Sequence, residues 1–242
     1  KELELAMDER RAHIAVHSLK DVPMELAPGF ALGAVLERAD AADAFVSARF
    51  RRVDELPPGA RVGTSSLRRQ AQLRALRPDV LPVDLRGNVG TRLARLDAGE
   101  YDAIILACAG LERLGLAARI ASRLEPPRWI PAASQGAIGI EYRVNDEYVA
   151  ELLRPLDDMD TARATAAERA MNRLLHGSCS VPIAAYCRET EPGLHLIGLV
   201  GDAVDGRLMR AEATGPVHDP EALGRHVAEL LLDQGAAAML GR

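Results

Sequence analysis

Two short segments place arginines at junctions between a predicted strand and a predicted helix. GTSSLRRQ at 63–70 and LRGNVGTR at 85–92 each follow an apolar run and precede a helical pattern. A helix N-terminus presents free backbone N–H groups and the positive end of the helix dipole. Guanidinium groups add bidentate donors for carboxylates or phosphates. The arginines are Arg68, Arg69, Arg86 and Arg92, and together they predict a site for several anionic groups at once.

The alternative interpretation is that these arginines are solvated residues in the first turns of ordinary helices. The chain uses arginine throughout, since its 30 basic residues include only Lys1 and Lys20 as lysines and therefore 28 arginines. Its formal net charge is nevertheless −5, which disfavours general binding to nucleic acid or to a membrane surface. Two such junctions in succession in an acidic protein favour a local anion site.

A carboxylate follows the predicted strand IAVHS in the segment HSLKDVP. Because Pro23 cannot continue a strand ladder, the chain leaves the sheet here, and Asp21 lies on a loop at the carboxyl end of a strand. A carboxylate in that position can move a proton or stabilise a developing cation. A turn aspartate that bonds its own backbone fits the same pattern. Lys20 precedes Asp21 directly.

The cysteines divide into two kinds. There are three, at 108, 179 and 187. An odd number argues against a disulfide scaffold and favours a reducing compartment, and the lack of CxxC spacing argues against a zinc site. Cys108 and Cys187 lie inside strand patterns, as buried small hydrophobic residues do. Cys179 lies outside any periodic run, in HGSCSVP, and is the candidate for a reactive or modified thiol, with a buried thiol as the alternative.

The first two thirds of the chain alternate short apolar runs with helical patterns. Strands are predicted at 14–17, 31–36, 44–47, 61–63, 80–85, 102–107 and 138–142, and helices at 3–11, 67–76, 89–98, 113–124 and 146–153. Asn88 is placed to cap one helix and Gly99 to close it. This alternation predicts α/β units with mainly parallel sheets, whose ligands bind at the carboxyl ends of strands.

The pattern changes near residue 156. A long helix is predicted at 161–175, followed by strands at 181–186, 194–200 and 207–214 and a last helix from 220 to 232. Strands bracketed by helices predict a small α+β domain. The chain is 242 residues long and 48% hydrophobic, enough for two or three domains. No apolar run approaches the roughly 20 residues of a membrane helix.

Two further features concern the beginning of the chain and its connections. It opens at Lys1 without Met, inside the amphipathic pattern KELELAMDERRA, with no targeting segment visible, and we expect an N-terminal portion to be missing. The segment PAASQGA at 131–137 consists mostly of small residues that allow close backbone approach. With the loop near 37–43, it is a candidate hinge between domains.

Longer motifs occur in a fixed order along the chain. They are HSLKDVP, VGTSSLRRQAQL, LRGNVGTRL, YDAIILACAGLERLG, ASQGAIGIE, TAERAMNRLLHGSCSVPI and a closing LVG…DG hairpin. With these motifs the chain closely resembles the porphobilinogen deaminases, also called hydroxymethylbilane synthases, over essentially its whole length. The resemblance implies an α/β fold with two periplasmic-binding-protein-like lobes plus a small C-terminal α+β domain. Domain 1 would comprise 1–38 and 135–156, domain 2 residues 39–134, and domain 3 residues 157–242.

The resemblance also implies an activity. The family condenses four porphobilinogen molecules head to tail into hydroxymethylbilane, with release of ammonia, in tetrapyrrole (haem) biosynthesis. It is primed by a dipyrromethane cofactor bound through a thioether to one cysteine, which matches Cys179, and its catalytic aspartate matches Asp21. Its acid-binding positions match Arg68, Arg69, Arg86, Arg92, Arg113 and Lys20, and its other cofactor or substrate contacts match Ser18, Ser65, Ser66 and Gln135.

The same resemblance implies a cytoplasmic monomer that acts on a small molecule and has no metal, nucleic-acid or membrane partner. The family's first strand–helix unit, which carries further ligands, would precede Lys1. A non-catalytic anion-binding receptor, or the sensor of a regulator, is the competing class. It would explain the α/β lobes and the arginines, but neither Cys179 nor a third domain.

Overall fold

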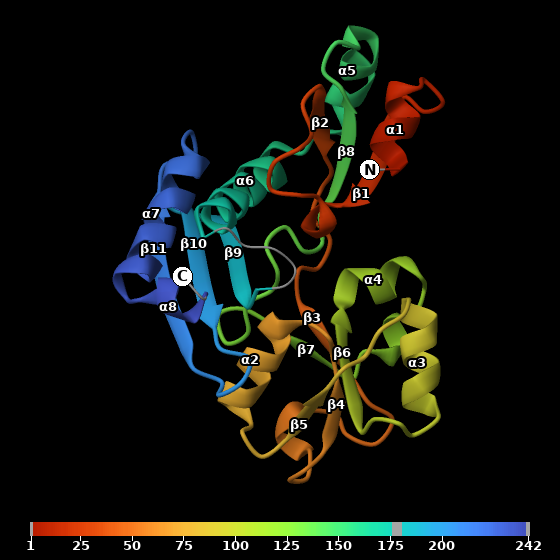
Figure 1. Cartoon of the computed structure of the whole chain (residues 1–242), viewed down its shortest axis with the longest axis vertical. Helices are drawn as coiled ribbons and strands as arrows, with labels where there is room; N and C mark the ends of the chain where they lie inside the picture. The colour runs from red at the N-terminus through yellow and green to blue at the C-terminus, as the bar shows by residue number, and fades with distance from the viewer. Residues whose placement is uncertain (1, 176–180, 241–242) are drawn as a thin grey trace.

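The computed structural model describes residues 2–175 and 181–240. These residues form three sheets, which lie in three groups of elements (Figure 1). The first lobe holds an antiparallel sheet in the order β1-β8-β2. Its strands are β1 (Ile14–Ser18), β2 (Phe30–Val35) and β8 (Ile138–Arg143), and its helices are α1 (Glu2–Asp8) and α5 (Glu147–Leu153).

The second lobe holds a mixed five-stranded sheet in the order β5-β4-β6-β3-β7. Its strands are β3 (Asp43–Val46), β4 (Arg61–Gly63), β5 (Leu81–Val83), β6 (Ala103–Ala107) and β7 (Ser122–Leu124). Its helices are α2 (Leu67–Leu76), α3 (Val89–Asp97) and α4 (Cys108–Arg113). The predicted cap of α3 is confirmed, because the Thr91 amide donates to Asn88 Oδ1 at 2.8 Å and Gly99 follows the helix end with φ +77°.

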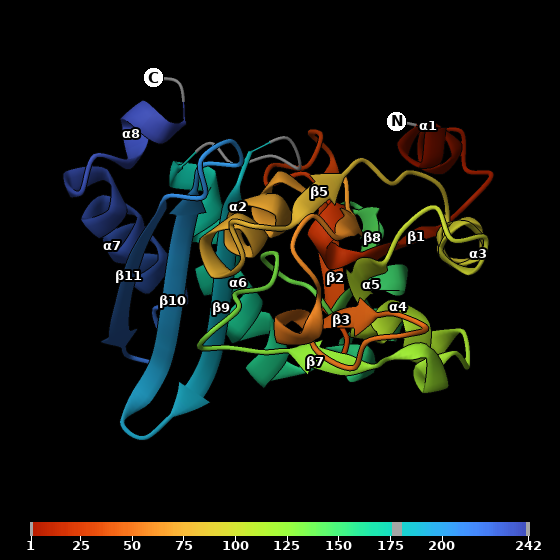
Figure 2. The same cartoon turned by 90° about the horizontal axis from the view of Figure 1, so that it is seen from below.

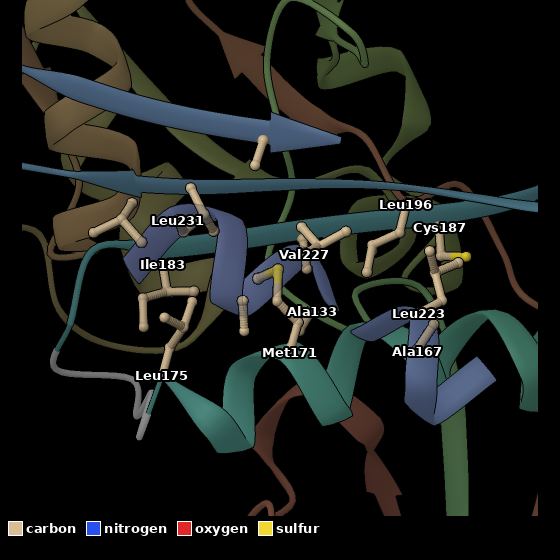
Figure 3. Close-up of a cluster of buried hydrophobic side chains, with 14 of the residues drawn as sticks. Ala133, Ala167, Met171, Leu175, Ile183, Cys187, Leu196, Leu223, Val227 and Leu231 are labelled. Atoms are coloured by element: carbon tan, nitrogen blue, oxygen red, sulfur yellow. The ribbon is translucent and has the colours of Figure 1, made fainter. Parts of the chain in front are cut away.

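The third unit packs two helices against one face of an antiparallel sheet in the order β11-β10-β9. Its elements are α6 (Met159–Leu174), β9 (Ile183–Thr190), β10 (Gly193–Gly201), β11 (Leu208–Gly215), α7 (Pro220–Asp233) and α8 (Ala236–Met239). Figure 3 shows Met171 of α6 and Val227 of α7 among the side chains of the apolar layer under this sheet. Figure 2 shows α7 on one side of the sheet and α2 on the other. The predicted change to an α+β arrangement in this part of the chain is confirmed.

Two expectations about local structure were wrong. The sheets are not mainly parallel: in the described residues only β4 pairs in parallel, with β5 and β6. Helices α2 and α3 serve as crossovers within the parallel set β4, β5 and β6, whereas β1, β2 and β8, and likewise β3 with β6 and β7, pair antiparallel. The helix expected at 113–124 is instead α4, which begins at Cys108; Gly115, with φ +71°, follows its end and 122–124 form β7. Cys108 therefore starts a helix and does not lie in a strand.

The chain passes between the first and second lobes twice, and the two crossing segments lie side by side. They are residues 36–42 and 131–137, and the Ala39 amide donates to Gly136 O at 3.2 Å. Gly136 has φ +92°, and a Cβ built there would lie 2.5 Å from Ala39 O. Only glycine fits this approach, so the two candidate hinge segments lie in direct contact at this crossing.

A fully buried carboxylate joins the third unit to this crossing. Glu168 of α6 accepts hydrogen bonds from Arg38 Nη1 at 2.7 Å, the Ser134 amide at 2.5 Å and the Cys187 amide at 2.7 Å. Arg38 also donates from Nε to Gln135 O at 2.8 Å. Because charge-assisted hydrogen bonds are among the stronger ones, Glu168 fixes α6 against both crossing segments.

Among the described residues, none of the helices combines the length and the apolar character required to cross a bilayer.

The packing of α6 on α7 depends on a glycine, which gives a test of the third unit. A Cβ at Gly224 would lie 2.3 Å from Ala167 O and 2.7 Å from Ala170 Cβ. We expect Gly224→Ala to lower the free energy of unfolding by about 1–3 kcal/mol, although alanine has the better helix propensity, because the clash is with backbone. Urea unfolding measures this change. Gly110→Ala in α4 is the matched control, since no atom lies within 4 Å of its Cβ position; equal effects of the two variants would contradict the packing.

Candidate active site

A cavity of about 620 Å³ opens where the two lobes and the third unit meet. The loop after β1, the β4–α2 junction, the second crossing segment, α6 and the start of β9 all contribute to its wall. It brings together many of the residues predicted for the site: Lys20, Asp21, Ser65, Ser66, Arg68, Arg69, Arg92 and Gln135. Of the described residues predicted for the site, none lines the second cavity, of about 520 Å³, beside Pro127 and Tyr186.

Other predicted residues lie elsewhere. Ser18 ends β1 and is not part of the cavity wall. Arg86 is 84% exposed and pairs with Asp84 at 3.0 Å, and the exposed Arg113 donates from Nη2 to Gly136 O at 2.7 Å. Cys179 lies outside the described residues. The binding roles of these residues remain predictions.

A fully buried carboxylate, Asp43, holds the two arginines at the start of α2. Its oxygens accept from Arg68 Nη1 at 2.9 Å and from Arg69 Nη2 at 2.6 Å. Two neutral donors complete the set, Trp129 Nε1 at 2.7 Å and Gln135 Nε2 at 2.9 Å. Burial alone would raise the pKa of Asp43, but the two guanidinium groups outweigh it and hold this pKa well below its usual range. Asp43 is therefore ionised at neutral pH.

Arg68 and Arg69 are only 4% and 6% exposed, so the interpretation of them as solvated first-turn residues is wrong. Besides Asp43, Arg68 Nη1 donates to Ile130 O at 2.7 Å, and Arg69 Nη1 donates to Ile105 O at 2.9 Å. Arg69 Nε is buried and has no partner among the described residues. Each guanidinium has five N–H donors, so both retain donors beyond those that Asp43 and the carbonyls occupy.

Ser65 joins the two arginine-bearing junctions. Its hydroxyl donates to Leu85 O at 2.8 Å and accepts from the Leu85 amide at 3.1 Å. The next residue, Ser66, donates its amide to Thr64 Oγ1 at 3.2 Å at the start of α2. Arg92 belongs to the second junction and lines the same cavity, where its Nε donates to Gly87 O at 2.7 Å. Arg68 and Arg69 of the first junction and Arg92 of the second thus line one cavity, which Arg86 does not.

Lys20 of the first lobe lines the same cavity and is linked through Gln135 to Asp43, the partner of Arg68 and Arg69. Its Nζ donates to Gln135 Oε1 at 3.3 Å, while the amide nitrogen of Gln135 donates to Asp43. Burial, and next the charge of Arg69, lower the pKa of Lys20 from its ordinary 10.5 to about 8, against the opposing effect of Asp43 and Asp21. The neighbouring Asp21 side chain is exposed in the 3₁₀ turn Leu19–Asp21, beyond the end of β1 as predicted.

Sequence reasoning missed two buried carboxylates that support the site, Asp43 and Glu168. Asp43 stands in DAFV, a short apolar run in which every residue is buried. Two adjacent arginines on a buried helix face need a counter-charge, and this requirement was the available indication. Nothing in the helical pattern around Glu168 distinguishes it from a solvated glutamate, because its partners lie 19 to 130 residues away in the chain.

Comparison with known proteins gives two family matches. Residues 1–151 match the model described as porphobilinogen deaminase, dipyrromethane cofactor binding domain, and residues 162–233 match porphobilinogen deaminase, C-terminal domain. The porphobilinogen deaminase of Stenotrophomonas maltophilia is 62% identical over 240 residues, which cover 99% of this chain and 79% of that protein. That of Xanthomonas euvesicatoria is 61% identical with the same coverage.

Solved structures with some similarity to this chain include a putative methionine-binding lipoprotein from Bacillus subtilis. Its TM-score is 0.45 at 12% identity, and the match covers 66% of this chain and 77% of that one.

The lowered pKa of Lys20 predicts a change of stability with pH. Below pH 8 the folded and unfolded chains both hold the Lys20 proton; between about 8 and 10.5 the unfolded chain holds more of it, so the free energy of unfolding rises across this window. We expect a rise on the order of 2–3 kcal/mol. Arginine stays charged throughout, so Lys20→Arg removes this part of the rise. Urea unfolding of both proteins at pH 7.5 and 10 measures the difference, and identical pH dependence would contradict the burial of the ammonium group.

Proposed function

Because the chain belongs to the porphobilinogen deaminase family, we propose that it condenses four porphobilinogen molecules head to tail into hydroxymethylbilane and releases ammonia. This is the transferase reaction of tetrapyrrole (haem) biosynthesis. The observation that carries the proposal is the cavity between the lobes, whose wall holds an exposed carboxylate, Asp21, together with Lys20, Arg68, Arg69 and Arg92. Such a wall suits a ligand with several carboxylates.

The donor set of the cavity also fits the dipyrromethane cofactor named in the family description. Each pyrrole of such a compound carries two carboxylates, and Arg69 offers a buried Nε without a partner among the described residues. Arg68, Arg69, Arg92 and Lys20 would hold these carboxylates, and Cys179 would carry the cofactor through a thioether. When bound, the cofactor supplies the pyrrole carbon to which the first substrate is joined.

Asp21 is the residue proposed to act on the reacting atoms. Loss of ammonia from porphobilinogen leaves a cationic methylene-pyrrole, and a carboxylate nearby stabilises that charge while it forms. The same carboxylate accepts hydrogen bonds from pyrrole N–H groups, and it can take up the proton that the attacked ring carbon loses. The Asp21 side chain is free for these tasks, since it lies exposed on its turn at the cavity wall.

Chain growth requires the cavity to enlarge or the growing chain to move through it. The two crossing segments that meet at Gly136 are the proposed hinge, since movement there changes the distance between the lobes.

We propose that the chain divides into three domains: domain 1 of 1–38 and 135–156, domain 2 of 39–134 and domain 3 of 157–242. We also propose that the protein acts as a monomer in the cytoplasm.

The mass of the purified protein tests the proposal. We expect the intact protein to exceed its sequence mass by a covalently bound pair of pyrrole units, and Cys179→Ser to lack this addition. An aldehyde colour test for pyrroles should separate the same two proteins. An unmodified protein that takes up no pyrrole from porphobilinogen would instead support a binding receptor.

The role of Asp21 predicts a loss of turnover without loss of the cofactor. We expect Asp21→Ala to lower the rate of hydroxymethylbilane formation by on the order of 100-fold or more, because the developing cation loses its counter-charge. Ammonia release and product formation measure the rate, and the mass of the variant confirms that it is loaded. Replacement of Asp8, an exposed aspartate at the end of α1, by alanine is the control. Turnover within a few fold of the parent in loaded Asp21→Ala would remove Asp21 from the mechanism.

A further inference from the structure

Arg169 of α6 clamps the loop that follows Asp21. Its guanidinium reaches three consecutive carbonyls of this loop: Nη1 donates to Val22 O at 3.2 Å, and Nη2 donates to Pro23 O at 2.6 Å and to Met24 O at 3.3 Å. The loop lies beyond the end of β1 at Ser18, so no neighbouring strand donates hydrogen bonds to these carbonyls. One side chain therefore supplies much of the hydrogen bonding that fixes the path of the chain directly after Asp21.

The charge of Arg169 makes this arrangement unusual. The residue is 7% exposed, and it forms no ion pair with any carboxylate of the described residues. Burial, and next the charge of Arg173, lower the pKa of its guanidinium. A buried charge without a counter-ion is costly, and a neutral packing residue would avoid that cost. Only a planar guanidinium, however, presents several donors in a fixed fork to carbonyls that lie side by side.

The helix that carries Arg169 also holds the other parts of the site in relation to one another. The preceding residue, Glu168, binds both crossing segments through Arg38 and the Ser134 amide. Figure 1 shows α6 between the β9–β11 sheet and the first lobe. In the sequence, α6 ends five residues before Cys179. The Asp21 loop is thus tied to the helix that leads to the proposed point of cofactor attachment.

We propose that Arg169 is a positioning residue that keeps the Asp21 carboxylate in register with the third unit while the second lobe moves. This inference rests on the proposed function of Asp21. In this arrangement, Asp43 holds the arginines of α2 to the second lobe, so they move with that lobe. Arg169 holds the Asp21 loop to α6, so Asp21 keeps its position relative to the third unit. When the second lobe moves, the polycarboxylate ligand bound to its arginines therefore shifts relative to Asp21.

Arg169→Gln in the loaded holoenzyme tests the proposal. One amide group cannot reach three carbonyls, so we expect kcat to fall on the order of 10- to 100-fold. KM should change less than threefold, because the cationic wall is untouched. Amide hydrogen exchange of residues 19–26 should become faster in this variant. Arg163→Gln is the matched control on the same helix, since the half-buried Arg163 pairs, among the described residues, with Asp160 of its own helix, and it should leave all three readouts unchanged.

A double-substitution cycle separates positioning from general stabilisation. If Arg169 acts through Asp21, adding Arg169→Gln to Asp21→Asn produces little further loss in a single-turnover rate, because the carboxylate is already absent. Two results would overturn the proposal. One is a double variant whose rate loss equals the product of the losses in the two single variants. The other is a kcat of Arg169→Gln within twofold of the parent. Arg169→Lys decides the matter if the glutamine variant fails to fold: it keeps the charge but not the fork, and should melt like the parent while kcat is reduced.

The same experiment distinguishes the failure of this proposal from failure of the proposed function. Near-normal turnover in Asp21→Asn alone would show that Asp21 has no catalytic role. Exchange of the 19–26 amides then still reports whether Arg169 fixes the loop. Normal turnover in Arg169→Gln, beside a strong loss in Asp21→Asn, would leave the function intact and contradict the clamp alone.

Discussion

The site depends on one buried carboxylate. Asp43 has no exposure to solvent, and four donors converge on it: two guanidinium groups, an indole and an amide. Burying two adjacent arginines without a counter-ion would cost several kcal/mol for each. Asp43 offsets that cost and leaves the pair with a net positive charge beside the cavity. The cationic wall that suits a polycarboxylate thus exists because an anion lies behind it.

The carboxylates in and around the site have different roles. Glu168 fastens α6 to both crossing segments, and Gln135 connects Lys20 of the first lobe with Asp43 of the second. Asp21 differs from Asp43 and Glu168, because it is exposed at the cavity wall. Asp43 and Glu168 accept several hydrogen bonds each and fix the geometry, while Asp21 is available for chemistry. Arg169 also contributes to the geometry, since its buried guanidinium holds the loop that follows Asp21.

The sequence motifs predicted most of the residues that line the cavity, but not the buried residues that hold them in place. The junctions at Arg68 and Arg92 and the turn at Asp21 were predictable, because strand ends, proline and capping residues determine them locally. Ser65 was expected as a ligand contact, and the structure adds that it joins the junctions through Leu85. The antiparallel pairing of β3 and the partners of Asp43, Glu168 and Arg169 depend on residues distant in the chain. Local periodicity carries no information about such pairings, and Gly115 shows that a turn residue overrides an apolar pattern.

Replacement of Asp43 by asparagine tests the central claim most directly. The variant keeps the size of the side chain, removes the counter-charge and turns one acceptor into a donor that faces other donors. We expect the free energy of unfolding to fall by about 3–5 kcal/mol, and the cofactor load, measured by intact mass, to fall with it at ordinary temperature. Asp54→Asn, which alters an exposed partner of Arg52, should change neither quantity. A stable and fully loaded Asp43→Asn protein would contradict the dependence of the arginine wall on this carboxylate.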